Sequence, residues 1–310
     1  IAFISFSCNK NDDKITPPSK QNPQTATSTT ASTATQTFVT TWSKLEVRFT
    51  KGHSHGYFHG NPDYPVKYLK TVQHFYFNNV NGVPTPAADN PTAIRWEGAD
   101  VVEEDHHDDE EEEHHNHQHN AGVSLYGIEL IFYDASGKRI NTMLSTGNNP
   151  NHYQFFFVAN NFVAVASNTT VPTQAEALNY KYRDTNPEEL YIKGGAGIDK
   201  NPNAPKGVLR QEQIGLKGFF EVKRTYINFD LRIVLGLFAS KPANLTYNTV
   251  PANKVLDVKI PIHIYTDLLR EDKTVEDAMR EFGVSKAEIK KDQDDIIASD
   301  LSPESSGTFL

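Results

Sequence analysis

The sequence predicts a mainly β protein, an antiparallel β-sandwich of one or two units, immunoglobulin-like or similar, with a short C-terminal helical appendix. Phe and Tyr, with 18 and 13 residues, far outnumber Met and Trp, with two each, which favours packing between sheets. Segments that alternate apolar and polar residues recur between loops rich in Gly, Pro and Asn. No helical pattern alternates with these segments, which argues against a parallel α/β sheet.

The predicted strands follow the alternating segments of residues 41–265, which we assign to the sandwich. Residues 45–49 alternate with a period of two, and Val258, Ile260, Ile262 and Ile264 share one parity, so they should face the core. A short turn at 134–137 should join two strands. The other predicted strands are 70–77, 123–133, 139–144, 153–166, 215–222, 226–238 and 254–265. The Gly- and Pro-rich loop 168–210 is the expected boundary if there are two sandwiches.

The segments outside the sandwich have other compositions. Residues 9–40 are rich in Thr, Ser, Pro, Gln and Asn and predict a disordered tether. Residues 266–301 predict the helical appendix, with a first helix from a Thr274 cap to a Gly283 stop and a second that begins at Ser285. Residues 302–310 predict a flexible tail.

The formal net charge of −9 comes from one short segment. Residues 103–119 contain nine carboxylates and no Lys or Arg, so the rest of the chain is neutral overall. A nucleic-acid-binding protein needs a basic surface, and the sequence has none that stands out. We therefore expect no nucleic-acid partner.

The same acidic segment is the first candidate metal site, within a loop 103–120 that we expect to be disordered. Neutral imidazole is a good ligand for Zn²⁺, Cu²⁺ and Ni²⁺, and nearby carboxylates attract cations. Many equivalent ligands predict several ions bound with little selectivity. A solvated acidic loop and a pH sensor are the alternatives. The six histidines are His106, His107, His114, His115, His117 and His119.

The second candidate metal site is a histidine-rich stretch that follows the strand at 45–49. If the backbone stays extended, His53, His55 and His59 project to one side and supply three of the four ligands of zinc. The glycines at 52, 56 and 60 would let the backbone fold around an ion. A loop that is merely histidine-rich is the alternative. A fourth ligand would have to come from elsewhere in the chain.

The remaining histidines are candidates for that further ligand. His74 lies beside residues 75–77, which are all aromatic, so a half-buried structural role is its alternative. A half-buried structural role is also the alternative for His152, which is next to Tyr153. His263 should face outward from its strand, which favours a plain surface role.

The common catalytic motifs are missing. The sequence has no His-Glu-x-x-His, no Gly-x-Ser-x-Gly and no phosphate-binding Gly-x-x-x-x-Gly-Lys-Ser/Thr. The glycine cluster at 194–197 predicts only a loop. We therefore expect a binding protein and no enzyme.

The single cysteine, Cys8, follows a short apolar stretch that predicts the end of a signal peptide at 1–8. With Asp12 and Asp13 soon after it, the cysteine resembles a lipoprotein processing site of the Bacteroidota type. Ser5 and Phe6 depart from the commoner Leu-rich pattern, and the resemblance covers only residues 1–13. It implies lipidation of Cys8, an outer-membrane location facing the cell exterior, membrane contact through the lipid alone, and an outer-membrane transporter as partner.

Three functions remain open at this point. The first is a surface lipoprotein that captures zinc, or copper, for delivery to an uptake receptor. The second is a zinc-dependent metalloenzyme that uses His53, His55 and His59. The third is a structural or glycan-binding surface lipoprotein.

Overall fold

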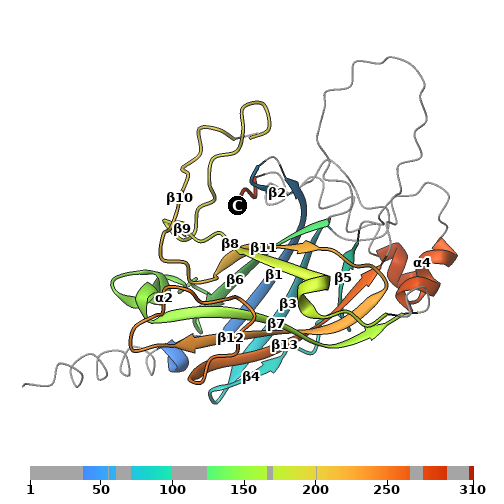
Figure 1. Cartoon of the computed structure of the whole chain (residues 1–310), viewed down its shortest axis with the longest axis horizontal. Helices are drawn as coiled ribbons and strands as arrows, with labels where there is room; N and C mark the ends of the chain where they lie inside the picture. The colour runs from blue at the N-terminus through green and yellow to red at the C-terminus, as the bar shows by residue number, and fades with distance from the viewer. Residues whose placement is uncertain are drawn as a thin grey trace, which may run out of the picture.

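The computed structural model describes residues 38–54, 56–60, 71–98, 124–165, 170–199, 201–265, 275–291 and 307–310. In these ranges the chain forms two curled, mainly antiparallel sheets, with a few short helices (Figure 1). This confirms the predicted antiparallel β-sandwich with a short C-terminal helical appendix. None of the described helices is long and apolar enough to cross a membrane. The expectations for residues 1–8 and 103–120 lie outside the described residues, and so does the tether predicted at 9–40 except for its last three residues. At 38–40 the predicted disorder is wrong, because residues 38–41 form a helical turn and Phe38 is buried in the core.

The larger sheet has seven strands in the order β4-β3-β1-β6-β11-β8, and β2 pairs with the end of β1. The long central strands β1 and β6 pair over nine residues, from Lys44 opposite Tyr133 to Gly52 opposite Leu125. The bounds are β1 Lys44–Ser54, β2 Phe58–Gly60, β3 Val72–Val80, β4 Val83–Pro86, β6 Ser124–Tyr133, β8 Leu178–Tyr182 and β11 Lys217–Val222.

The smaller sheet has four strands in the order β5-β13-β12-β7. Strand β5 runs parallel to β13, and the other pairs are antiparallel. The bounds are β5 Ile94–Glu97, β7 Tyr153–Ala164, β12 Ile227–Leu237 and β13 Lys254–Tyr265. A separate two-stranded ribbon joins β9 Thr185–Asn186 to β10 Val208–Leu209.

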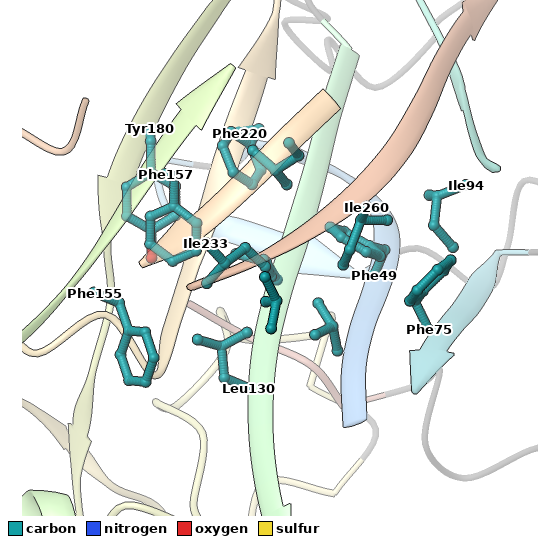
Figure 2. Close-up of a cluster of buried hydrophobic side chains, with 14 of the residues drawn as sticks. Phe49, Phe75, Ile94, Leu130, Phe155, Phe157, Tyr180, Phe220, Ile233 and Ile260 are labelled. Atoms are coloured by element: carbon teal, nitrogen blue, oxygen red, sulfur yellow. The ribbon is translucent and has the colours of Figure 1, made fainter. Parts of the chain in front are cut away.

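One hydrophobic core fills the space between the two sheets (Figure 2). Side chains from both sheets meet in it, and the residues predicted to face inward on β13 do so, with Ile260 and Ile262 fully buried. The described chain therefore forms one sandwich. The segment 168–210 does not separate two sandwiches, because β8 pairs with β11 of the large sheet and its Leu178 and Tyr180 belong to the same core.

The predicted strand at 139–144 is also wrong. The turn before it forms as expected, with Gly137 at a φ of +81°, but only Arg139 bridges back to Tyr133. The side chain of Asn141 then takes the place of a strand: its Oδ1 accepts the N–H of Phe132 and its Nδ2 donates to the carbonyl of Leu130, each over 2.8 Å. Helix α2, Thr142–Ser145, begins directly after it. The other short helices before the appendix are a helical turn at 38–41, η1 Asn149–Asn151 and α3 Gln174–Ala177.

The helical appendix forms around the predicted signals. Helix α4, Val275–Phe282, ends at Gly283, which has a φ of +65° and donates its N–H to the carbonyl of Met279. Ser285 caps the next turn by accepting the N–H of Glu288 over 3.2 Å. Ile289 is fully buried, and an ion pair joins Glu288 to Arg95 of β5, so the appendix is attached to the small sheet.

The predicted flexible tail is wrong for residues 307–310. Phe58 donates its N–H to the carbonyl of Leu310 over 2.8 Å, and Leu310 donates back over 3.0 Å. Gly60 also donates to the carbonyl of Thr308 over 2.8 Å. Phe309 and Leu310 are buried, so their burial offsets the entropy that a free tail would keep. The C mark in Figure 1 accordingly lies beside β2.

Candidate metal site

A hairpin at one end of the large sheet carries the histidines predicted at 53 and 59. Strand β1 ends at Ser54, whose partner is Phe58, so the chain reverses between them. Gly56 lies in this reversal with a φ of +83°, which glycine adopts without strain. The expectation of one continuous extended strand is therefore wrong, although the two histidines still face the same side.

His53 and His59 are direct cross-strand partners in this hairpin. Their ring centroids are 4.9 Å apart and their planes are inclined by 68°. Two imidazoles that ligate one tetrahedral zinc through bonds of about 2.0–2.1 Å have ring centroids about 5 Å apart. The Nδ1 atoms of both rings are buried. The pair therefore has the spacing of two ligands of one metal ion.

The glycines near the pair have a packing role. The ring of Phe58 lies against Gly52 and Gly127, where a built Cβ would come within 2.4 Å and 2.8 Å of ring carbons. At Gly60 a Cβ would come within 2.9 Å of the Cβ of Thr308. The described glycines thus make room for Phe58 and for the C-terminal segment, and the hairpin is held by that packing.

The ring of Phe309 extends the histidine pair into a row of three. Phe309 is the β-bridge partner of His59, and the two rings stack with centroids 4.6 Å apart and planes inclined by 11°. Tyr57 meets Phe309 edge-on at 6.0 Å, and Gly194 lies so close that a Cβ there would come within 2.6 Å of the ring. Sequence analysis missed Phe309, because nothing near it in sequence links it to the hairpin.

The segment that contains the six acidic-run histidines is joined to the sandwich beside this pair. On its N-terminal side, Glu97 ends β5 and forms an ion pair with Lys51, two residues before His53. The N–H of Glu97 also donates to the hydroxyl of Tyr126 over 2.7 Å. On its C-terminal side β6 begins at Ser124, and Leu125 pairs with Gly52. Both ends of the segment are therefore fixed next to the histidine pair.

Seven of the predicted ligands lie outside the described residues, and one lies elsewhere in the fold. The seven are His55, His106, His107, His114, His115, His117 and His119. His74 is the partner of Arg48, which is about 17 Å along β1 from His53 at about 3.4 Å per residue. Its Nδ1 lies 2.9 Å from Oε1 of Glu46, and its ring stacks on Tyr76. The structure does not bring His74 to the pair.

The other two histidines have structural surroundings. His152 is buried, with Nδ1 3.0 Å from the carbonyl oxygen of Phe238 and Nε2 2.9 Å from the side-chain nitrogen of Asn148. His263 is half-buried opposite Arg95, and burial together with the charge of Arg95 lowers its pKa. Neither lies in a group of metal ligands.

A charged cluster on the outer face of the large sheet was also missed by sequence analysis. Arg139 binds Glu129 over 3.0 Å and also pairs with Glu188, while Lys217 and Tyr191 complete the surroundings of Glu129. Burial alone would raise the pKa of Glu129, but the charges of Arg139, Lys217 and Arg48 hold it below its usual value. Through Glu188 and Tyr191, the cluster ties the 183–191 loop to the sheet.

Within the described ranges, no three His, Cys, Asp or Glu side chains gather closely enough to hold a metal ion. The described part of the chain places two imidazoles, those of His53 and His59, side by side. Comparison with protein-family models, curated proteins and solved structures found no match. The fold and the site define a class only: a mainly β protein with a histidine pair at one end of its sandwich.

Proposed function

We propose that the protein is a surface lipoprotein that captures a transition metal, zinc first and copper or nickel as alternatives, and delivers it to an outer-membrane uptake receptor. One observation carries the proposal. The cross-strand pair His53–His59 has the spacing of two ligands of one ion, and the segment with six histidines joins the sandwich directly beside it.

The two parts have complementary chemistry. Residues 103–119 combine six imidazoles with nine carboxylates, which attract cations but specify no single geometry. His53 and His59 are held by a paired hairpin, so their geometry is fixed before an ion arrives. In this proposal the acidic run collects the ion and the pair holds it, with His55 as the third protein ligand.

Metal titration of the full chain separates the two parts. A chain whose six run histidines are replaced by serine should keep one zinc ion, and the additional change His53→Ala with His59→Ala should abolish it. The matched controls are His152→Ala and His263→Ala, which should leave that ion in place. If the serine-substituted chain binds no zinc, or binds it equally well after the double substitution, the histidine pair is not the holding site.

The anchor is tested separately. When the chain is expressed in a Gram-negative host behind a lipoprotein signal sequence, an alkyne-labelled palmitate should label it, and Cys8→Ala should remove the label. Protease added to intact cells should then digest the wild-type protein if it faces the exterior. Labelling that persists in Cys8→Ala would refute lipidation at this residue.

A further inference from the structure

We propose that Phe309 is a positioning residue for the histidine pair, so that metal binding at His53 and His59 and docking of residues 307–310 on β2 strengthen each other. This inference rests on the proposed metal-binding function and adds the C-terminal segment to it.

The stacked geometry between Phe309 and His59 carries the inference. An imidazole on a strand can rotate about two side-chain bonds, so its ring nitrogens sweep through space unless a neighbour fixes the ring plane. The ring of Phe309 lies nearly parallel to the ring of His59, with centroids 4.6 Å apart. The ring of His53 meets the same His59 ring edge-on, with centroids 4.9 Å apart. His59 is only 4% exposed. Phe309 thus limits the His59 ring to the orientation in which it contacts His53.

Phe309 is itself fixed from several sides. Its carbonyl accepts the N–H of Ile192 over 3.3 Å, and its ring fills the space left by the missing side chain of Gly194. The Nζ of Lys206 lies 5.9 Å from the ring centroid. These contacts come from the 191–207 loop, so the ring that orients His59 is supported independently of the hairpin.

Leu310 anchors the segment separately from Phe309. Its side chain belongs to a small apolar cluster with Phe58, Leu125 and Phe219 on the outer face of the large sheet. Phe58 stacks on Phe219 with centroids 5.6 Å apart. The segment therefore has one anchor in the apolar cluster and one contact with a metal-ligand side chain, which allows the two to be separated by substitution.

Thermodynamic linkage makes the coupling reciprocal. If docked Phe309 raises the affinity of the pair for an ion, the bound ion must favour the docked segment by the same factor. The amides of Phe58 and Leu310, which hydrogen-bond each other's carbonyls, report the docked state through hydrogen exchange.

The first test measures zinc affinity in the full chain with the six run histidines replaced by serine. Phe309→Ala should weaken the binding of zinc about tenfold, because the segment loosens and His59 gains freedom. Phe309→Leu keeps apolar volume but lacks a flat face, and should weaken it about threefold. The matched control is Phe156→Leu, a buried aromatic of the small sheet, which should leave zinc affinity unchanged. Wild-type affinity in either Phe309 variant would overturn the inference.

The second test measures hydrogen exchange of residues 307–310 with and without zinc. Saturating zinc should slow exchange at Leu310, and the effect should vanish after His53→Ala with His59→Ala. A chain that binds zinc through the pair without slowing this exchange would overturn the inference and leave the proposed function intact. A chain whose zinc binding does not depend on the pair would instead overturn the proposed function, and this inference with it.

Discussion

The side-chain amide of Gln73 in β3 hydrogen-bonds both backbone groups of Arg95 in β5: Nε2 donates to the carbonyl oxygen over 2.6 Å, and Oε1 accepts the N–H over 2.9 Å. One side chain thus acts as a short neighbouring strand where the large sheet meets the small one. The side chain of Gln174 forms a similar pair of bonds with β7. Its Nε2 donates to the carbonyl oxygen of Phe157 over 2.9 Å, and its Oε1 accepts the N–H of Ala159 over 3.0 Å.

Replacing Gln73 with alanine should therefore destabilise the fold. The change leaves two backbone groups of a buried residue without these bonds, which costs about 1–3 kcal/mol. Gln174→Ala should cost a similar amount, because it removes the same kind of contact. Denaturant unfolding measures both, and Gln211→Ala at an exposed position is the control, expected within about 0.5 kcal/mol of the wild type. Equal stability of Gln73→Ala and this control would contradict the prediction.

Glu46 should contribute a defined part of the acid sensitivity. Burial alone would raise its pKa, but hydrogen bonds from His74 and Tyr133 and the charge of Arg48 lower it to about 2. A carboxylate with a lowered folded-state pKa stabilises the fold fully above the unfolded value, and this stabilisation disappears as the pH falls from about 4.5 to about 2.

The corresponding measurement compares the wild type with Glu46→Gln. The wild type should lose on the order of 3 kcal/mol more unfolding free energy between pH 5 and pH 2 than the variant, since each pKa unit corresponds to about 1.4 kcal/mol. Parallel stability curves for the two proteins across this range would contradict the prediction. Glu276→Gln, at an exposed carboxylate of the appendix, is the control.

The hairpin offers a comparison of two glycines. Gly52→Ala puts a methyl group within 2.4 Å of the Phe58 ring and of the His59 carbonyl oxygen, so the hairpin must shift, at a cost of about 1–3 kcal/mol. Gly56→Ala meets nothing within 4 Å but must adopt a φ of +83°, which costs about 1–2 kcal/mol. Both variants lower the midpoint of thermal unfolding, but only Gly52→Ala should also weaken zinc binding by the pair. Equal zinc affinities would refute this.

Asp184 should be one of the most sensitive polar positions. Its carboxylate is buried and accepts the backbone N–H groups of four consecutive residues, over distances of 2.7–3.0 Å. Asp184→Ala leaves four buried donors without this acceptor and should cost more than about 3 kcal/mol. Asp184→Asn keeps one acceptor oxygen and should cost less. A lower calorimetric stability of Asp184→Asn than of Asp184→Ala would contradict this account. The four donors are Ile214, Gly215, Leu216 and Lys217.

Local patterns were sufficient to predict most of the long strands and the appendix. The inward residues of β13 were predicted from their parity, and the Gly283 stop from the conformational freedom of glycine, because both depend on neighbours in sequence. Six short strands were not predicted, since strands of two to five residues carry too little periodicity. They are β2, β4, β5, β8, β9 and β10.

The candidate site was predictable only in part, for a related reason. Histidine content singled out His53 and His59, but their pairing depends on a reversal at Gly56 that the sequence alone did not require. Phe309 approaches them from the far end of the chain, and no local signal encodes such a contact. His74 was a reasonable candidate by residue type, yet the sheet register sets it opposite Arg48.

Because Glu97 and Ser124 are each fixed in a sheet, the sequence between them can change in composition and length without loss of the sandwich. Each residue is fixed by a different sheet, and the entropic cost of closing the intervening loop rises only with the logarithm of its length. Substitutions, repeats or deletions of histidine and acid within 103–119 therefore cost the sandwich little. Under the proposed function, metal preference and capacity can therefore be changed there while the histidine hairpin and its scaffold stay the same.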